Sequence, residues 1–219
     1  MNLVITELLD MAELEAMRAH LESALKFKSG KTTAGHHARA VKDNQQASAE
    51  SAAPILAKVE ATLLNHPVFK AAARPKKFVK LMISRYGPGM HYGTHVDDPL
   101  MGGIRTDLSF TLFLAPPESY EGGSLIIEDN EGDRAYKLSV GSLILYPATS
   151  LHRVEEVRSG ERLAIVGWIR SYLRDPQQRE MLFDLENTIA TLNASQAPRP
   201  VLDQLYKMRA NLLRMWVED

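Results

Sequence analysis

The sequence predicts a mainly β protein of the α+β class, with a core that is an antiparallel sandwich or jelly roll and helices at both ends. Two observations predict this fold class. Short apolar runs separated by turn residues fill the middle of the chain, and apolar residues repeat at helical spacing on either side. The 219 residues allow one full domain with appended structure, which we divide into residues 1–75, 76–174 and 175–219.

Residues 1–75 are expected to form a mostly helical segment that packs on the core. Two sets of apolar residues recur there at roughly helical spacing: Leu9, Leu14, Met17, Leu21 and Leu25, then Ile55, Val59, Leu63 and Leu64. Between them lies a polar stretch, residues 29–46, to which the sequence assigns no role. Its GKTT run lacks the earlier glycine and the preceding strand of a phosphate loop, so we expect an ordered surface segment. The adjacent His36 and His37 are expected to be solvated.

The jelly-roll domain is expected within residues 76–174. Apolar and polar residues alternate over residues 79–84 and 108–114, which is the period of a strand. Further short strands are predicted at SLIIED, RAYKL, SLILYP and LAIVGWI, each following a turn sequence. The Gly102–Gly103 pair lies shortly after Asp97 and predicts a loop that would suit a lid.

Residues 175–219 are expected to form a helical hairpin. The apolar positions fall into two helical sets, one containing Leu182, Leu185, Ile189 and Leu192, the other Val201, Leu205, Met208, Leu212 and Met215. The segment NASQAPRP separates them. Packing of these apolar stripes against the sheet is favoured over the alternative, a homodimer formed through the C-terminal helices.

Composition excludes several classes of protein. The apolar fraction of 45% and the charged fraction of 24% are ordinary for a globular chain, and no apolar run reaches the ~18 residues of a membrane span. Lys and Arg number 26 against 27 Asp and Glu, so nucleic acid is not an expected partner. Acidic residues precede Arg18 and cysteine is absent, which together predict a cytoplasmic protein. Any metal must be held by His, Asp or Glu.

One pair of residues carries metal-binding potential. His95 and Asp97 are two apart, so on an extended strand both side chains lie on one face. His152 follows 55 residues after Asp97, and a jelly roll can bring its strand against theirs. Two histidines and one carboxylate suit non-haem Fe(II) and leave positions for O₂ and a chelating co-substrate. The alternatives are a polar loop pair for His95 and Asp97, and a buried histidine bonded to backbone for His152.

An arginine and a tyrosine accompany this set. Arg162 lies ten residues after His152 on the next predicted strand, where a dicarboxylate that chelates the metal could meet its guanidinium. Tyr86 lies nine residues before His95 and is interpreted equally as a phenol donor into the same cavity or as a sheet aromatic.

These residues resemble the motif of the iron- and 2-oxoglutarate-dependent dioxygenase superfamily. Their surroundings, RYGPGMHYGTHVD, DLSFTLFLAPPESYEGGSLII and HRVEEVRSGERLAIVGWIRS, are similar to its prolyl-hydroxylase branch. The flanking segments SGKTTAGHHARAVKDNQQ and NLLRMW resemble those of bacterial PKHD-type hydroxylases, so the resemblance spans nearly the whole chain.

The resemblance implies a double-stranded β-helix with Fe(II) bound by His95, Asp97 and His152. It implies 2-oxoglutarate held by Arg162, with Tyr86 beside it, and L-ascorbate as the reductant. The implied reaction hydroxylates an unidentified small molecule or protein side chain with O₂, releasing succinate and CO₂. It also implies, more loosely, a link to bacterial iron uptake.

Two rival functions stay open on the sequence. One is a non-redox, cupin-like jelly roll that binds sugars or acts as a metal-dependent isomerase. The other is a nucleic-acid demethylase, for which Arg153, Arg158, Arg162 and Arg170 offer local positive charge. Such demethylases resemble a pattern with a second arginine six residues after the anchoring one, where this chain has Trp168, which we expect in the sheet core.

Overall fold

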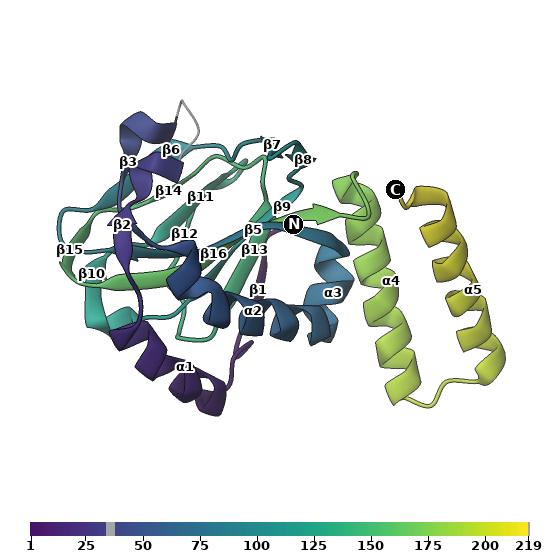
Figure 1. Cartoon of the computed structure of the whole chain (residues 1–219). Helices are drawn as coiled ribbons and strands as arrows, with labels where there is room; N and C mark the ends of the chain where they lie inside the picture. Colours follow the sequence, from purple (N-terminus) through teal and green to yellow (C-terminus); the bar gives the residue numbers. More distant parts are fainter. Residues whose placement is uncertain (34–37, 219) are drawn as a thin grey trace.

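Two antiparallel β-sheets lie face to face at the centre of the molecule (Figure 1). The computed structural model describes residues 1–33 and 38–218. The strand order in the larger sheet is β1 (Leu3–Ile5), β13 (Leu143–Pro147), β9 (Leu108–Phe113), β16 (Arg162–Ser171), β5 (Pro75–Tyr86), β4 (Gln45–Ala47) and β2 (Phe27–Ser29). The order in the smaller sheet is β12 (Gly132–Tyr136), β11 (Leu125–Asp129), β14 (His152–Val154), β6 (His91–His95) and β3 (Lys42–Asp43).

Two further strand pairs close the ends of the sandwich. At one end, β10 (Tyr120–Gly122) pairs with β15 (Val157–Gly160). At the other, β7 (Leu100–Met101) and β8 (Ile104–Arg105) form a hairpin whose turn residues Gly102 and Gly103 have φ of 58° and 77°, the left-handed region that glycine adopts most readily. The loop predicted after Asp97 is therefore this hairpin, and its movement as a lid stays a prediction.

The alternation along β9 shows why the protein has two cores. Leu108, Phe110 and Leu112 belong to the core between the larger sheet and the N-terminal helices. Phe113, which follows Leu112, points to the opposite face and belongs to the core between the two sheets. Because both faces of the larger sheet are covered, all six residues of β9 are buried.

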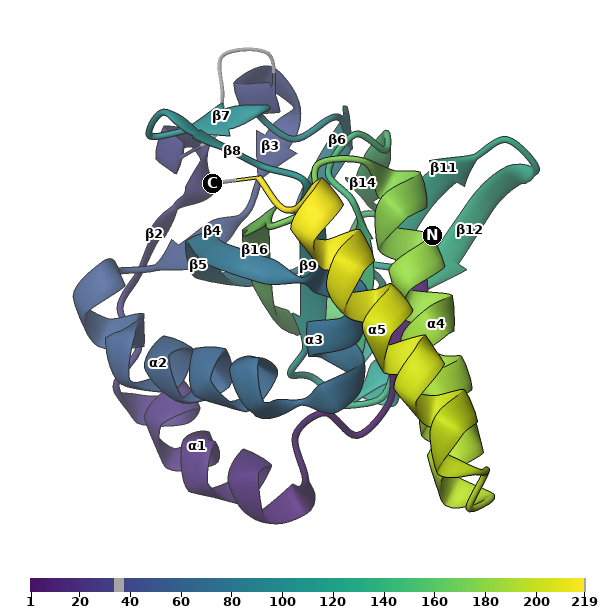
Figure 2. The ribbon, with the colours of Figure 1, turned by 90° about the vertical axis from the view of Figure 1, so that its right-hand side faces the viewer.

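Helices cover the outer face of the larger sheet (Figures 1 and 2). The first, α1 (Met11–Ser23), begins with a capping box in which Asp10 accepts from the Glu13 backbone N–H and Glu13 from that of Asp10. It is followed by α2 (Ala49–Asn65) and α3 (Pro67–Ala73). The buried residues of α2 lie every three or four positions and face the sheet: Ala52, Ile55, Val59 and Leu63.

The N-terminal segment contains the predicted helices, and it also contains strands that the sequence did not predict. Short strands β1 to β4 also belong to this segment and extend the edges of the sheets. Strands of two or three residues are too short for a periodic signal, and their formation depends on the edge that they join. The GKTT run forms a 3₁₀ turn, and the Gly30 backbone N–H donates to the Asn44 carbonyl over 2.9 Å. The pair His36 and His37 lies outside the described residues.

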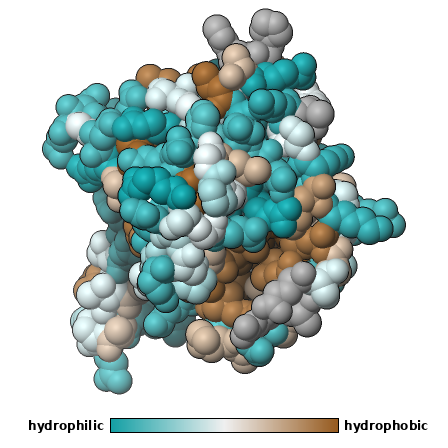
Figure 3. Space-filling model, turned by 90° about the vertical axis from the view of Figure 1, so that its left-hand side faces the viewer, coloured by the Kyte–Doolittle hydropathy of each residue, from teal (hydrophilic) through white to brown (hydrophobic). Residues whose placement is uncertain are grey.

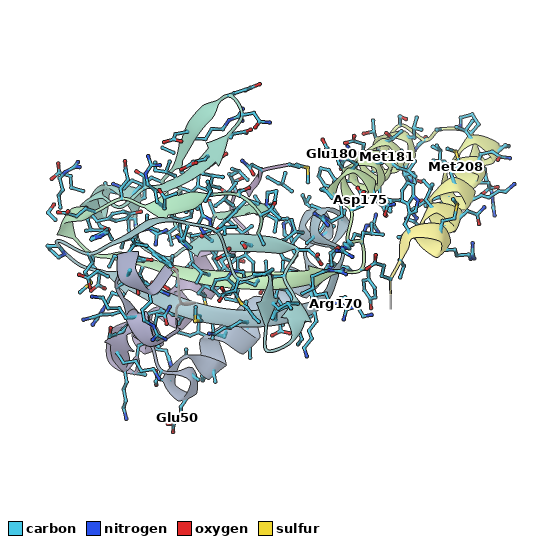
Figure 4. All side chains as sticks on the ribbon, turned by 90° about the horizontal axis from the view of Figure 1, so that it is seen from above. Glu50, Arg170, Asp175, Glu180, Met181 and Met208 are labelled. Carbon is cyan, nitrogen blue, oxygen red and sulfur yellow. The ribbon has the colours of Figure 1, made fainter. Side chains whose placement is uncertain are left out.

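The C-terminal hairpin consists of α4 (Pro176–Ala194) and α5 (Arg199–Trp216) and projects from the body of the molecule (Figure 1). The prediction that it packs against the sheet is wrong, because α4 packs chiefly on α3 and on α5. Glu186 of α4 links the three helices, with oxygens 2.8 Å from Arg74 and 3.0 Å from Arg209. Exposed methionines such as Met181 and Met208 lie on this arm (Figure 4), and a homodimer through it stays a prediction.

An apolar groove lies between α1 and the larger sheet. It has a volume of about 840 Å³, and its apolar lining includes Leu14, Leu25, Leu114 and Leu163. Hydrophobic side chains gather in a hollow on this side of the molecule (Figure 3).

The described helices are too short or too polar to cross a lipid bilayer.

Candidate metal and co-substrate site

The fold brings together the three residues that the sequence singled out for a metal. His152 at the start of β14 is paired in register with His95 at the end of β6, and Asp97 follows β6. One potential ligand atom from each residue lies within 4.8 Å of those of the other two. Asp97 and His152 are buried, with 8% and 5% of their surface exposed, so a cation here would be shielded from bulk water.

An irregularity in the pairing of β14 with β6 brings Tyr92 onto the same face. His152 pairs with His95 but Val154 pairs with Tyr92, so β6 contains one extra residue at this point. Residues three apart on a regular strand would face opposite sides. Because of the extra residue, the Tyr92 ring stacks on the His95 imidazole with their centroids 3.7 Å apart. Gly93 lies in the bulge, where a Cβ would come within 2.8 Å of Val41 Cβ.

Backbone contacts fix the orientation of both imidazoles. Nδ1 of His95 lies 2.8 Å from the Gly93 carbonyl, and Nδ1 of His152 lies 3.0 Å from the Ser150 carbonyl. A carbonyl only accepts hydrogen bonds, so each Nδ1 is the protonated nitrogen and each Nε2 keeps a lone pair. Metal-binding histidines typically donate such a hydrogen bond from the ring nitrogen that does not bind the metal.

The carboxylate is held in a similar way. Asp97 Oδ2 accepts a 2.6 Å hydrogen bond from the Ser109 hydroxyl on the larger sheet, and it lies 3.8 Å from His152 Nε2. Burial and the neighbouring His152 lower the pKa of His95 to about 4, so its imidazole is neutral near pH 7. Neutral imidazole is the form that binds a metal.

Arg162 lies across the same cavity, on β16. Its side chain is 1% exposed, and its three guanidinium nitrogens have no hydrogen-bond partner among residues 1–33 and 38–218. Its guanidinium carbon lies 5.2 Å from the Tyr86 ring centroid and 5.5 Å from that of Phe113. Aromatic faces compensate only part of the cost of burying a charge, so this arginine is suited to an anionic ligand.

Tyr86 pairs with Arg162 in the register of β5 and β16 and lines the cavity. It is buried, which raises the pKa of its phenol against the opposing effects of Arg162 and Asn44. It is therefore both a sheet aromatic and a cavity residue, so the two interpretations of Tyr86 are compatible.

The cavity between the sheets has a volume of about 290 Å³ and contains all five predicted site residues in its lining. Several lining residues were not predicted, and they include Lys42, Asn44, Gln46, Lys80 and Tyr146. Trp168 also lines the cavity and is half-buried, so its assignment to the sheet core is wrong. Residues 42–46 are all polar in the sequence, so no pattern there indicated which of them line the cavity.

Comparison with known proteins decides the family. Residues 81–170 match the model of the 2OG-Fe(II) oxygenase superfamily, and residues 176–218 match the PKHD-type hydroxylase C-terminal domain. A PKHD-type hydroxylase of Acaryochloris marina is 49% identical over 220 residues, covering 100% of both chains. The chain belongs to the PKHD-type hydroxylase family. Another member, from Parvibaculum lavamentivorans, is 53% identical over 194 residues, covering 88% of each chain.

The fold comparison agrees with the family. A prolyl-4-hydroxylase structure from Pseudomonas putida superposes with a TM-score of 0.53 at 21% identity, covering 78% of this chain and 92% of that one. The jelly-roll prediction with two C-terminal helices is thereby confirmed. As a PKHD-type hydroxylase, the protein is a 2-oxoglutarate-dependent dioxygenase that uses Fe(II) and O₂. Membership of this family displaces the non-redox alternative.

Proposed function

We propose that the protein hydroxylates its substrate at an iron centre held by His95, Asp97 and His152, with 2-oxoglutarate anchored by Arg162. The observation that carries this assignment is the buried, unpartnered guanidinium of Arg162 in the same cavity as the three ligands. A guanidinium fork matches a carboxylate in two parallel hydrogen bonds. Tyr86, beside Arg162, is proposed to line the 2-oxoglutarate pocket.

Each residue has a separate task in this proposal. The histidines present Nε2 because their Nδ1 atoms are engaged with backbone carbonyls. Asp97 supplies the negative charge that partly balances Fe(II), and Ser109 holds its carboxylate in place. When bound, iron and 2-oxoglutarate supply the oxidising chemistry that hydroxylates a C–H bond, with release of succinate and CO₂.

The surroundings of the metal suit a reaction that must exclude water. Apolar side chains from both sheets line the cavity, including Leu125, Val154 and Val166. We propose L-ascorbate as the agent that keeps the iron reduced. A role in bacterial iron uptake is proposed on the family resemblance alone.

Anaerobic addition of Fe(II) and then 2-oxoglutarate to metal-free protein tests this function. We expect a weak visible charge-transfer band from the chelated complex, lost in His152→Ala and retained in His91→Ala. His91 is a matched control because it is an exposed histidine of the same pair of strands. We expect Asp97→Ala to abolish 2-oxoglutarate turnover. Iron binding without the band in the unmodified protein would contradict the proposed assignment of the site residues.

Three of the four arginines that favoured a demethylase have other contacts or positions. Arg153 lies 2.8 Å from Asp133, Arg158 lies 3.2 Å from Glu121, and Arg162 is inside the cavity. This arrangement supports the prediction that nucleic acid is not a partner. A gel-shift assay with single-stranded DNA at moderate salt tests it.

A further inference from the structure

Residues 42–47, which we call the strap, give a role to part of the segment that the sequence left unassigned. Lys42, Asn44 and Gln46 are buried, whereas Asp43 is exposed. Alternate residues of an extended chain share one face, and all three buried residues line the catalytic cavity. The strap therefore presents a polar face to the inside of the protein.

Contacts on both sides fix the strap in place. Its first part pairs with β6 of the smaller sheet, with Lys42 opposite Tyr92. Its second part pairs with β5 of the larger sheet, with Gln45 opposite Arg85. The strap thus joins the edges of the two sheets and forms one wall of the cavity.

Positive charge collects where the strap meets the metal ligands. Lys42 Nζ lies 4.8 Å from the centroid of the Tyr92 ring, which stacks on His95. Burial and the nearby Lys80 lower the pKa of Lys42 to about 8, so it remains mostly charged at pH 7. Lys80 is exposed and lines the cavity.

Trp168 adds a hydrogen-bond donor beside these lysines. It is opposite Lys80 in the register of β16 and β5. Its indole Nε1 is buried and has no hydrogen-bond partner among the described residues. A buried N–H of this kind requires an acceptor, because leaving it unpaired costs free energy.

This end of the cavity is distant from Arg162. Arg162 and Trp168 are six residues apart on one strand, which separates their backbones by roughly 20 Å. Iron and 2-oxoglutarate carry opposite charges of equal size, so their binding adds no net charge to the cavity. Among the described lining residues, three cations (Lys42, Lys80 and Arg162) then exceed two carboxylates (Asp97 and Asp98).

We infer that the primary substrate carries a carboxylate, which Lys42, Lys80 and the indole N–H of Trp168 bind at the end of the cavity opposite Arg162. This inference rests on the proposed function, because it assigns the Arg162 end to 2-oxoglutarate. The strap makes the lysine end selective for acids over amides and amines of the same shape.

The test measures how charge affects binding to protein loaded anaerobically with Fe(II) and 2-oxoglutarate. Three flat probes of similar size are titrated by calorimetry: benzoate, benzamide and benzylamine. We expect benzoate to bind at least about 10-fold more tightly than the other two, which is the usual strength of a charge-assisted hydrogen bond. Lys42→Met should remove about 10-fold of benzoate affinity, Lys42→Arg should retain most of it, and Trp168→Phe should weaken it several-fold.

Lys58→Met is the matched control, because Lys58 is a half-buried lysine on α2 that does not line the cavity. It should leave all three affinities unchanged. Equal affinity for benzoate and benzamide, no binding of any probe, or equal benzoate affinity in Lys42→Met and Lys58→Met overturns the inference. The charge-transfer band separates the two hypotheses: without the band the proposed function fails, whereas a band without acid selectivity overturns only this inference.

Discussion

Replacing Arg162 with Met should stabilise the protein without ligands and weaken its binding of 2-oxoglutarate. The two effects have one cause, because the guanidinium is buried without a hydrogen-bond partner among the described residues. Met is long, apolar and flexible, so it can fill most of the vacated space. A purely structural arginine would give the opposite sign for stability.

The magnitude follows from the surroundings of Arg162. Burying an unpaired cation costs several kcal/mol even after relaxation. The rings of Tyr86 and Phe113, 5.2 and 5.5 Å away, each return about 1 kcal/mol. Arg162→Met should therefore raise the free energy of unfolding by about 1 to 3 kcal/mol. For a chain of this size, each kcal/mol corresponds to a rise of about 3 °C in Tm.

Thermal unfolding with and without 2-oxoglutarate, in the presence of Fe(II), measures both effects. The Kd for 2-oxoglutarate should rise by roughly 100-fold or more, because its distal carboxylate loses its partner. Arg162→Lys is the matched control, since it keeps the charge without the fork and should not gain stability. A lower Tm for ligand-free Arg162→Met than for the unmodified protein would refute the reasoning.

Three further predictions concern the metal ligands and the hairpin. Ser109→Ala should weaken Fe(II) binding by about 10-fold or more in a chelator competition, and an unchanged affinity would contradict its role. Because the pKa of His95 is lowered to about 4, unfolding takes up a proton, so metal-free protein should lose stability in urea as pH falls from about 6.5 toward 4. His95→Gln should flatten that dependence. Glu186→Gln should lower the free energy of unfolding by about 1 kcal/mol and speed amide hydrogen exchange in α5. Unchanged exchange rates in α5 would disprove this role of Glu186.

The central strands could be predicted from the sequence because each is long enough to show its period. The set His95, Asp97 and His152 could be predicted because two members are close in sequence and the topology supplies the third. Tyr92 could not, because residues three apart on a regular strand face opposite sides. Only the extra residue in β6, set by pairing with β14, brings the ring onto His95.

Other features could not be predicted because both faces of a strand are covered. Along β16, residues of both faces are enclosed, so the period of two does not say which face meets helices and which meets the cavity. Trp168, which was expected in the sheet core, instead lines the cavity and is half-buried. The cavity-facing residues of the strap could not be predicted, because residues 42–46 are all polar and such a run looks the same whether it faces solvent or a polar cavity.

Because His95 is paired with His152, iron binding depends on the register of β6 and β14. A slip of one residue between β6 and β14 would turn one imidazole to the opposite face, where it could not reach the ion. An ion that needs both imidazoles therefore binds only the correctly paired strands and stabilises them, by about 2.7 kcal/mol at 100 times its Kd. Iron supply would then govern how much of the newly made protein has β6 and β14 correctly paired, in addition to how much of it is active.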